Sequence, residues 1–165
     1  MEQRYDLSGS LLHWYDYNKR ILPWRENKDP YRIWISEIML QQTRVEAVKP
    51  YFDRFMEVLP TVYDLAKVDD DRLMKLWEGL GYYNRARNLK AAAQTIVEEY
   101  GGQLPADYDK LLSLKGIGMY TAGAIGSIAF ELQVPAVDGN VLRVLTRLWG
   151  DDSDILKDKT KKAMG

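Results

Sequence analysis

The hydrophobic pattern of the chain has the period of an α-helix almost everywhere. Apolar residues recur every three or four positions, glycine or proline separates the segments, and the alternation expected of β-strands is scarce. We therefore predict an all-α fold. The expected helices are residues 7–19, 31–41, 44–58, 61–66, 69–78, 85–100, 108–113, 120–130 and 140–149, with a further helix beginning near residue 158.

The chain lacks the side chains that build disulfides and common metal sites. It contains no cysteine and a single histidine, His13, so it offers no thiolate for a cluster and too few ligands for a common zinc site. We expect no metal and no small-molecule cofactor in this chain, and any catalysis would rest on carboxylates and tyrosines. No apolar run is long enough to span a membrane and the N-terminus does not resemble a secretory signal, so we expect a cytoplasmic protein without membrane contact.

The charge distribution allows a nucleic-acid partner although the formal net charge is -1. Acidic residues cluster at 69–71 and 151–154, whereas the segment 82–90 carries Arg85, Arg87 and Lys90 and no acid. A basic face of the kind that phosphate binding requires can therefore form.

Glu37 lies within a helix that is apolar nearly all round. On a helical wheel, Ile33 and Leu40 flank its carboxyl group. Burial disfavours the charged form of a carboxyl and raises its pKa, which a general acid working near neutral pH requires. The alternative is a glutamate on the helix surface that forms an ion pair with Arg44.

A glycine-rich turn, Gly116-Ile117-Gly118, joins two predicted short helices. Glycine permits positive φ, and the free amides at the start of the second helix can bind one phosphate without sequence preference. The two helices would pack closely through the small residues Ala122, Gly123, Ala124 and Gly126. The alternative is a plain helical hairpin with glycine at a C-cap.

Asp138 follows an apolar run and precedes the predicted helix 140–149. The amides and the dipole of a helix N-terminus favour an ionised carboxylate, and a simple N-cap role would also explain this position. A protonated Glu37 with an ionised Asp138 is the pair that cleavage of a glycosidic bond needs. One carboxyl protonates the leaving group and the other stabilises the cationic sugar or bonds to it.

The segment Gly79-Leu-Gly-Tyr-Tyr83 places two aromatic side chains in a loop ahead of Arg85 and Arg87. Such a loop is typical of a wedge that enters a base stack while arginines bind phosphate. Packing of Tyr83 into the core is the alternative.

In this order and spacing, the four motifs resemble the helix-hairpin-helix, endonuclease III-like superfamily of DNA glycosylases. The Pro-x-x-Asp loop of that superfamily is present as Pro135-Ala-Val-Asp138, and the match covers about residues 22–150. The resemblance implies the all-α helix-hairpin-helix glycosylase fold. It places a six-helix barrel at residues 24–135 and a partial iron–sulfur-type helical domain at residues 1–23 and 136–165.

Within the superfamily, the chain is most similar to MutY-type adenine DNA glycosylases, which hydrolyse the N-glycosidic bond of adenine mispaired with 8-oxoguanine or guanine. The discriminating positions are Leu40-Gln41-Gln42-Thr43, Gly79-Leu-Gly-Tyr-Tyr83, Asp138-Gly-Asn140 and Tyr120. Endonuclease III-like relatives carry a nucleophilic lysine where Tyr120 stands, so its absence implies a monofunctional enzyme. Thymine or uracil mismatch glycosylases tend to have Arg-Arg in place of Gln41-Gln42. The alternatives are a glycosylase of either kind or a non-catalytic helix-hairpin-helix DNA-binding module.

The resemblance also implies roles for individual residues. Glu37 would protonate the adenine ring and Asp138 would stabilise the oxocarbenium-like sugar, while Asn140 and Tyr120 would orient these groups. The expected base-pocket residues are Trp24, Arg25 and Leu40. The expected DNA-binding residues are Gln41, Gln42, Tyr82, Arg85, Lys115, Gly116, Gly118 and Thr121. The expected partner is double-stranded DNA with a flipped-out adenine, in the nucleoid of a bacterial cytoplasm.

Family members usually continue through further helices to cysteines that hold a 4Fe-4S cluster. We expect that cluster in a full-length member, and we expect this cysteine-free chain to be truncated before it and to be weakly active or inactive. The missing helices would cover the predicted helix 140–149. We therefore expect an exposed apolar patch that includes Leu145 and Trp149, and a tendency to associate.

Overall fold

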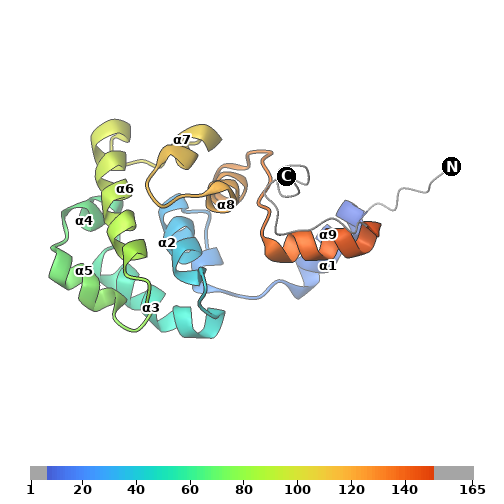
Figure 1. Ribbon diagram of the computed structural model, residues 1–165, viewed down its shortest axis with the longest axis horizontal. Coiled ribbons are helices and arrows are strands. Elements are labelled where there is room, and N and C mark those ends of the chain that lie inside the picture. Colours follow the sequence, from blue (N-terminus) through green and yellow to red (C-terminus); the bar gives the residue numbers. More distant parts are fainter. Residues whose placement is uncertain (1–6, 151–165) are drawn as a thin grey trace.

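The computed structural model describes residues 7–150, which contain helices and no β-strand (Figure 1). The elements are α1 (Leu7–Asn18), the 3-10 helix η1 (Pro23–Arg25), α2 (Pro30–Leu40), α3 (Val45–Val58), α4 (Val62–Lys67), α5 (Asp70–Trp77), α6 (Asn84–Tyr100), α7 (Tyr108–Ser113), α8 (Met119–Phe130) and α9 (Gly139–Trp149). The all-α prediction is confirmed, and the predicted helix ends within this range differ from the observed ones by at most one residue. The sequence did not predict η1, and the helix expected near residue 158 lies outside the described residues.

Side chains with short polar groups begin several of these helices. The Asp69 carboxylate accepts a hydrogen bond from the Arg72 amide at 2.8 Å at the start of α5, and Thr61 forms a capping box with Asp64 at the start of α4. Such caps satisfy amides that have no partner inside the helix and contribute about 1 kcal/mol each. Part of the acidic cluster 69–71 therefore has a structural role in starting a helix.

The core lies among α2 to α8, with the largest fully buried side chains on α2, α3 and α5. Trp34, Phe52, Phe55 and Trp77 are fully buried, and the Phe55 and Trp77 rings meet edge to face at 6.3 Å. Helix α2 packs against α3, α8 and η1, while α4 packs against α6 and α7 against α8. The central position of α2 explains why this helix is apolar nearly all round.

Helices α1 and α9 lie at the opposite end of the molecule from α4 and α5 (Figure 1). No residue of α1 is buried, and on α9 Trp149 is 63% exposed while Leu145 is half-buried. The expected apolar exposure is therefore confirmed for Trp149 and is only partial for Leu145.

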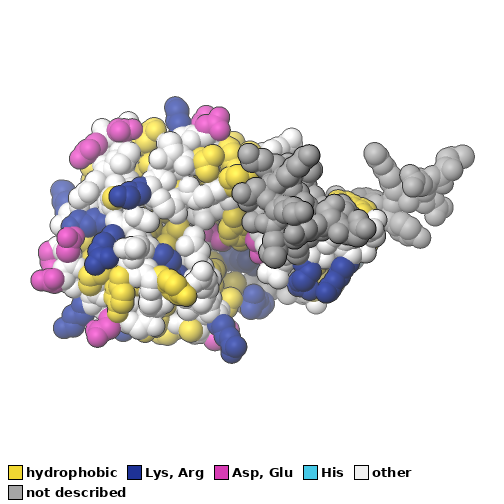
Figure 2. All heavy atoms as spheres, viewed as in Figure 1, with side chains coloured by type: hydrophobic (Ala, Val, Ile, Leu, Met, Phe, Trp, Pro, Cys, Tyr) yellow, Lys and Arg dark blue, Asp and Glu magenta, His cyan; other side chains and the backbone are white. Residues whose placement is uncertain are grey.

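The surface of the helical body carries basic and acidic side chains side by side. On the face shown in Figure 2, Lys and Arg are spread over the body and acidic groups lie along its rim, so no single large basic patch forms there. Among residues 7–150, no helix combines the length and the apolar character that crossing a membrane would require.

Candidate active site

Glu37 on α2 lies where side chains from three other parts of the chain meet. The hydroxyl of Tyr120, in the first turn of α8, forms a hydrogen bond with its carboxyl group, and Arg25 and Asp138 are close enough to affect its charge. Arg44 is exposed, and the ion pairs found in the described part of the chain do not join it to Glu37. Glu37 itself is half-buried, so the structure favours a partly desolvated carboxyl over the surface ion pair.

The surroundings of Glu37 favour its protonated form. Burial raises the pKa of Glu37 above its ordinary value, Asp138 raises it further, and the hydrogen bond from Tyr120 and the charge of Arg25 lower it without reversing the direction. Burial and the two nearby carboxylates also raise the pKa of Tyr120 to about 12. Tyr120 therefore keeps its proton near neutral pH and remains a hydrogen-bond donor.

Asp138 is the N-cap of α9 and receives a hydrogen bond at each of its carboxylate oxygens. Its Oδ1 accepts from the Val141 amide at 2.8 Å, and its Oδ2 accepts from the Asn140 side-chain amide at 3.3 Å. The Asn140 Oδ1 in turn accepts from Arg143 at 3.3 Å, which sets the orientation of the Asn140 amide. These donors and the positive end of the helix dipole stabilise a negative charge on Asp138.

The segment that leads to Asp138 crosses α8 at Gly123. A Cβ atom at this position would lie 2.0 Å from the carbonyl oxygen of Pro135, closer than real contacts allow. At Gly126 a Cβ would meet the side chains of Leu132 and Val134. The prediction that these two glycines serve packing within the hairpin is therefore wrong, because both face the segment that follows α8.

The turn between α7 and α8 has the geometry expected of a helical hairpin with free amides. Gly116 has a φ of +80°, whereas Gly118 has a φ of -91°, so only Gly116 requires glycine for its backbone conformation. Gly118 is the N-cap of α8 and provides no side chain to cap the helix, while Lys115 is exposed beside it. Thr121 is only 3% exposed, so its side chain faces the interior and only its backbone amide is left for the expected contact with DNA.

Two of the expected DNA-contacting side chains occupy a left-handed backbone conformation. Gln42, between α2 and α3, has a φ of +60°, and Tyr82, between α5 and α6, has a φ of +47°. Both side chains are exposed, and Tyr82 retains 67% of its surface. Such a conformation costs about 1–2 kcal/mol for a residue other than glycine and persists where the surrounding structure enforces it.

Arg85 does not present its guanidinium group to solvent as the sequence predicted. The group donates hydrogen bonds to the carbonyl oxygens of five residues, which are Ile38, Met39, Gln41, Leu80 and Gly81. The expectation of a direct phosphate contact is corrected accordingly, because these carbonyls already occupy both terminal nitrogens and the remaining donor, Nε, is buried. Sequence reasoning missed this role since its acceptors are backbone atoms, which no motif reveals.

The expected base-pocket residues are in three different environments. Trp24 is 3% exposed and packs edge to face on Phe52 with centroids 5.4 Å apart, so it belongs to the core and offers little surface to a base. Arg25 is exposed and donates to the Tyr15 hydroxyl at 3.2 Å, and Leu40 is half-buried at the end of α2. Tyr15, which no sequence motif indicated, bonds to Arg25 and lines a hollow of about 520 Å³ together with it.

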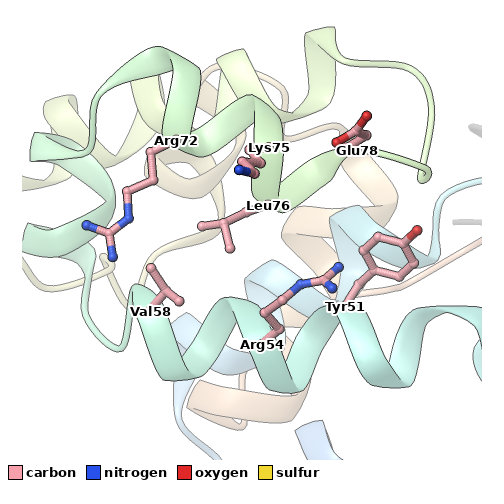
Figure 3. Close-up of a pocket in the computed structure, with 7 residues that line it drawn as sticks. All are labelled: Tyr51, Arg54, Val58, Arg72, Lys75, Leu76 and Glu78. Atoms are coloured by element: carbon pink, nitrogen blue, oxygen red, sulfur yellow. The ribbon is translucent and has the colours of Figure 1, made fainter.

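A second hollow, of about 510 Å³, lies between α3 and α5 (Figure 3). It is lined by Tyr51, Arg54, Val58, Arg72, Lys75, Leu76 and Glu78. It contains one carboxylate, Glu78, so this hollow does not offer a pair of carboxyl groups such as Glu37 and Asp138. Residues 7–150 form no group of three or more potential metal ligands, and the chain has no cysteine, so its residues do not fit a 4Fe-4S cluster.

A family model described as "HhH-GPD superfamily base excision DNA repair protein" matches residues 35–165. The adenine DNA glycosylase of Rattus norvegicus is 47% identical over 148 residues, which are 84% of this chain and 29% of that protein. The adenine DNA glycosylase of Buchnera aphidicola subsp. Acyrthosiphon pisum is 45% identical over 157 residues, covering 94% of this chain and 45% of that protein. The chain thus spans less than half the length of these relatives.

Solved structures have the same arrangement of helices. A thermostable thymine-DNA glycosylase superposes with a TM-score of 0.85 at 30% identity, over 94% of this chain and 74% of that one. A non-covalent endonuclease III-DNA complex superposes with a TM-score of 0.77 at 27% identity, over all of this chain and 79% of that one.

Proposed function

Since the chain belongs to the HhH-GPD superfamily of base excision DNA repair proteins, we propose that it removes adenine mispaired with 8-oxoguanine or guanine from duplex DNA by hydrolysis. The observation that carries the proposal is the pairing of two carboxyl groups in opposite environments. Burial raises the pKa of Glu37, whereas Asp138 accepts hydrogen bonds at a helix N-terminus. Relatives at 45–47% identity named adenine DNA glycosylase support adenine as the base.

In the proposed reaction, Glu37 donates its proton to the imidazole ring of adenine. The bond between the sugar C1′ and the base nitrogen then breaks, and its electrons leave with the protonated base. Asp138 stabilises the positive charge that develops on the sugar, and water adds to C1′ with loss of a proton. Tyr120 orients the Glu37 carboxyl through its hydrogen bond, and Asn140 orients Asp138.

A tyrosine in place of a lysine favours hydrolysis without strand cleavage. Tyr120 keeps its proton near neutral pH because burial and nearby carboxylates raise its pKa to about 12. It therefore does not attack the sugar in the way that a lysine amine does. Because a thymine-DNA glycosylase superposes on this chain with a TM-score of 0.85, a G:T mismatch is the competing substrate to test. Adenine is favoured by the higher identity of the adenine-specific relatives.

A single-turnover assay on an 8-oxoguanine:adenine duplex tests the proposal, with a G:T duplex in parallel. We expect adenine release by the full-length protein and a fall of at least 100-fold in Glu37→Gln, because a general acid contributes about 10²–10⁴-fold. The matched control is Glu57→Gln, which changes an exposed glutamate on α3. Adenine release that is unaffected by Glu37→Gln would refute the mechanism, and base release from G:T alone would identify a thymine glycosylase. Duplex binding without release of either base would indicate a non-catalytic module.

A further inference from the structure

The two exposed left-handed residues, Gln42 and Tyr82, are connected through one half-buried side chain, Arg85. The peptide carbonyl that precedes Gln42 belongs to Gln41, and it accepts from Arg85 Nη1 at 2.6 Å. The carbonyl that precedes Tyr82 belongs to Gly81, and it accepts from Arg85 Nη2 at 3.2 Å. A single guanidinium therefore holds both peptide groups whose rotation would release the left-handed conformations.

The remaining contacts of Arg85 hold the same two loops to the helices beside them. Nη1 also donates to the carbonyl oxygens of Ile38 at 2.9 Å and Met39 at 3.2 Å, in the last turn of the helix that carries Glu37. Nη2 donates to the Leu80 carbonyl at 3.0 Å. The last carbonyls of a helix lack most of their partners within it, and Arg85 supplies donors to them. It shares the Ile38 carbonyl with the Gln41 amide, at 3.3 Å, and the Gly81 carbonyl with the Trp77 indole, at 3.1 Å.

A small cavity connects Arg85 with the hairpin turn. It has a volume of about 50 Å³ and is lined by Trp34, Ile38, Gln41, Arg85, Asn88, Leu89, Lys115 and Gly116. The indole Nε1 of Trp34, which is fully buried, and the Nε of Arg85 have no hydrogen-bond partner among the described residues. A cavity of this volume has room for a water molecule, and both residues that carry an unpartnered donor line it.

We propose that Arg85 is a positioning residue, which keeps Gln42 and Tyr82 in the conformation that enters the base stack. This inference rests on the proposed function for the meaning of the DNA contacts. It assigns Arg85 no phosphate contact. Lysine cannot replace it, because an ammonium group has three donors on one atom and does not form the planar fork that reaches both loops.

The salt dependence of DNA binding separates this role from a phosphate contact. The probes are a duplex with 8-oxoguanine opposite a tetrahydrofuran abasic analogue and an undamaged duplex of the same sequence. For Arg85→Lys we expect a loss of about tenfold or more in affinity for the lesion duplex, with unchanged affinity for the undamaged duplex and an unchanged salt slope. A direct phosphate contact would instead weaken both complexes and reduce the salt slope by about 1, which would overturn the proposal.

Amide hydrogen exchange in the free protein tests the same link without DNA. In Arg85→Lys we expect faster exchange in both loops, residues 41–43 and 80–83, relative to the wild type. The matched control is Arg87→Met on the same helix, since Arg87 is exposed and its guanidinium bonds only to the Asn84 side chain one turn away, at 3.1 Å. Unchanged exchange in either loop would refute a common support by Arg85.

The two experiments also separate this inference from the proposed function. A wild-type protein that does not distinguish the lesion duplex from the undamaged one would contradict the proposed function, whereas the exchange experiment would still decide the role of Arg85. Arg85→Met removes every donor of the guanidinium group. The carbonyls of Ile38, Gln41 and Gly81 each keep one other donor, from the Gln41 amide, the Thr43 hydroxyl and the Trp77 indole respectively. If this variant does not fold, Arg85→Lys, whose folding is checked by circular dichroism, carries the comparison.

Discussion

Replacement of Gly123 by alanine should displace the segment that carries Asp138. The added Cβ would lie 2.0 Å from the Pro135 carbonyl oxygen and 3.1 Å from the Ala136 Cα, so the obstacle is backbone and cannot rotate away. The segment has to move by about 1 Å or more to restore ordinary contact. Asp138 follows only three residues after Pro135, and a shift of this size in a reacting group lowers the rate by about 100-fold.

The same clash sets the expected effect on stability. Overpacking of a close contact costs about 1–3 kcal/mol, and in a protein of this size each kcal/mol lowers Tm by about 2–4 °C. We therefore expect Gly123→Ala to melt about 3–10 °C below the wild type and to release adenine about 100-fold more slowly in single turnover. Its affinity for undamaged duplex should stay unchanged, because the hairpin turn at Gly116 and Gly118 is not touched.

Gly126→Ala on the same helix is the matched control. Its Cβ would meet the Val134 Cγ2 at 3.1 Å and the Leu132 Cδ1 at 3.4 Å, which are side-chain atoms that can adjust. We expect a change of under about 1 kcal/mol in the free energy of unfolding and a rate close to that of the wild type. Equal losses in the two variants, or a Gly123→Ala variant with wild-type activity, would refute the reasoning.

Two further predictions follow from the electrostatics around Glu37. Because burial raises the pKa of Glu37 above 4.5 in the folded state, its ionisation opposes folding, and the wild type should lose stability relative to Glu37→Gln as pH rises from about 4.5 through the folded pKa. Thermal melts from pH 4 to 8 check this, and a difference in Tm that does not grow with pH would contradict it. In Tyr120→Phe the hydrogen bond that lowers the pKa of Glu37 is lost, so this pKa should rise and the alkaline limb of the pH–rate profile should move to higher pH. A limb that stays in place or moves to lower pH would show that Tyr120 does not act through Glu37.

Much of the site could be predicted because its determinants are local. The helix that carries Glu37 is apolar on both sides of the carboxyl. This pattern left burial and a surface ion pair with Arg44 both open, and the other motifs favoured burial. Asp138 lies directly before α9, so its role as an N-cap needs only the adjacent amides. The approach of Tyr120 and Asp138 to Glu37 came from a resemblance in the sequence, and the packing of α8 against α2 supports it.

Some residues have an environment that differs from the expected one, and in each case contacts with distant parts of the chain determine that environment. Trp24 was expected in a base pocket and is buried against Phe52, and Thr121 was expected at DNA and faces the interior. Which side chains of a helix face the core depends on which other helices pack against it. The residue pattern of one helix does not determine this.

The sequence by itself determined the α-helices of residues 7–150 and the N-cap of α9 at Asp138, because periodicity and capping act over a few residues. Tertiary structure alone decided the use of Gly123, which accommodates the Pro135 carbonyl, and of Arg85, which donates to the Ile38 carbonyl 47 residues away. Both contacts involve backbone atoms, and every residue carries the same carbonyl. A pattern of side chains therefore cannot reveal these two contacts. Only the folded chain determines which carbonyl lies against Gly123 and which carbonyls Arg85 reaches.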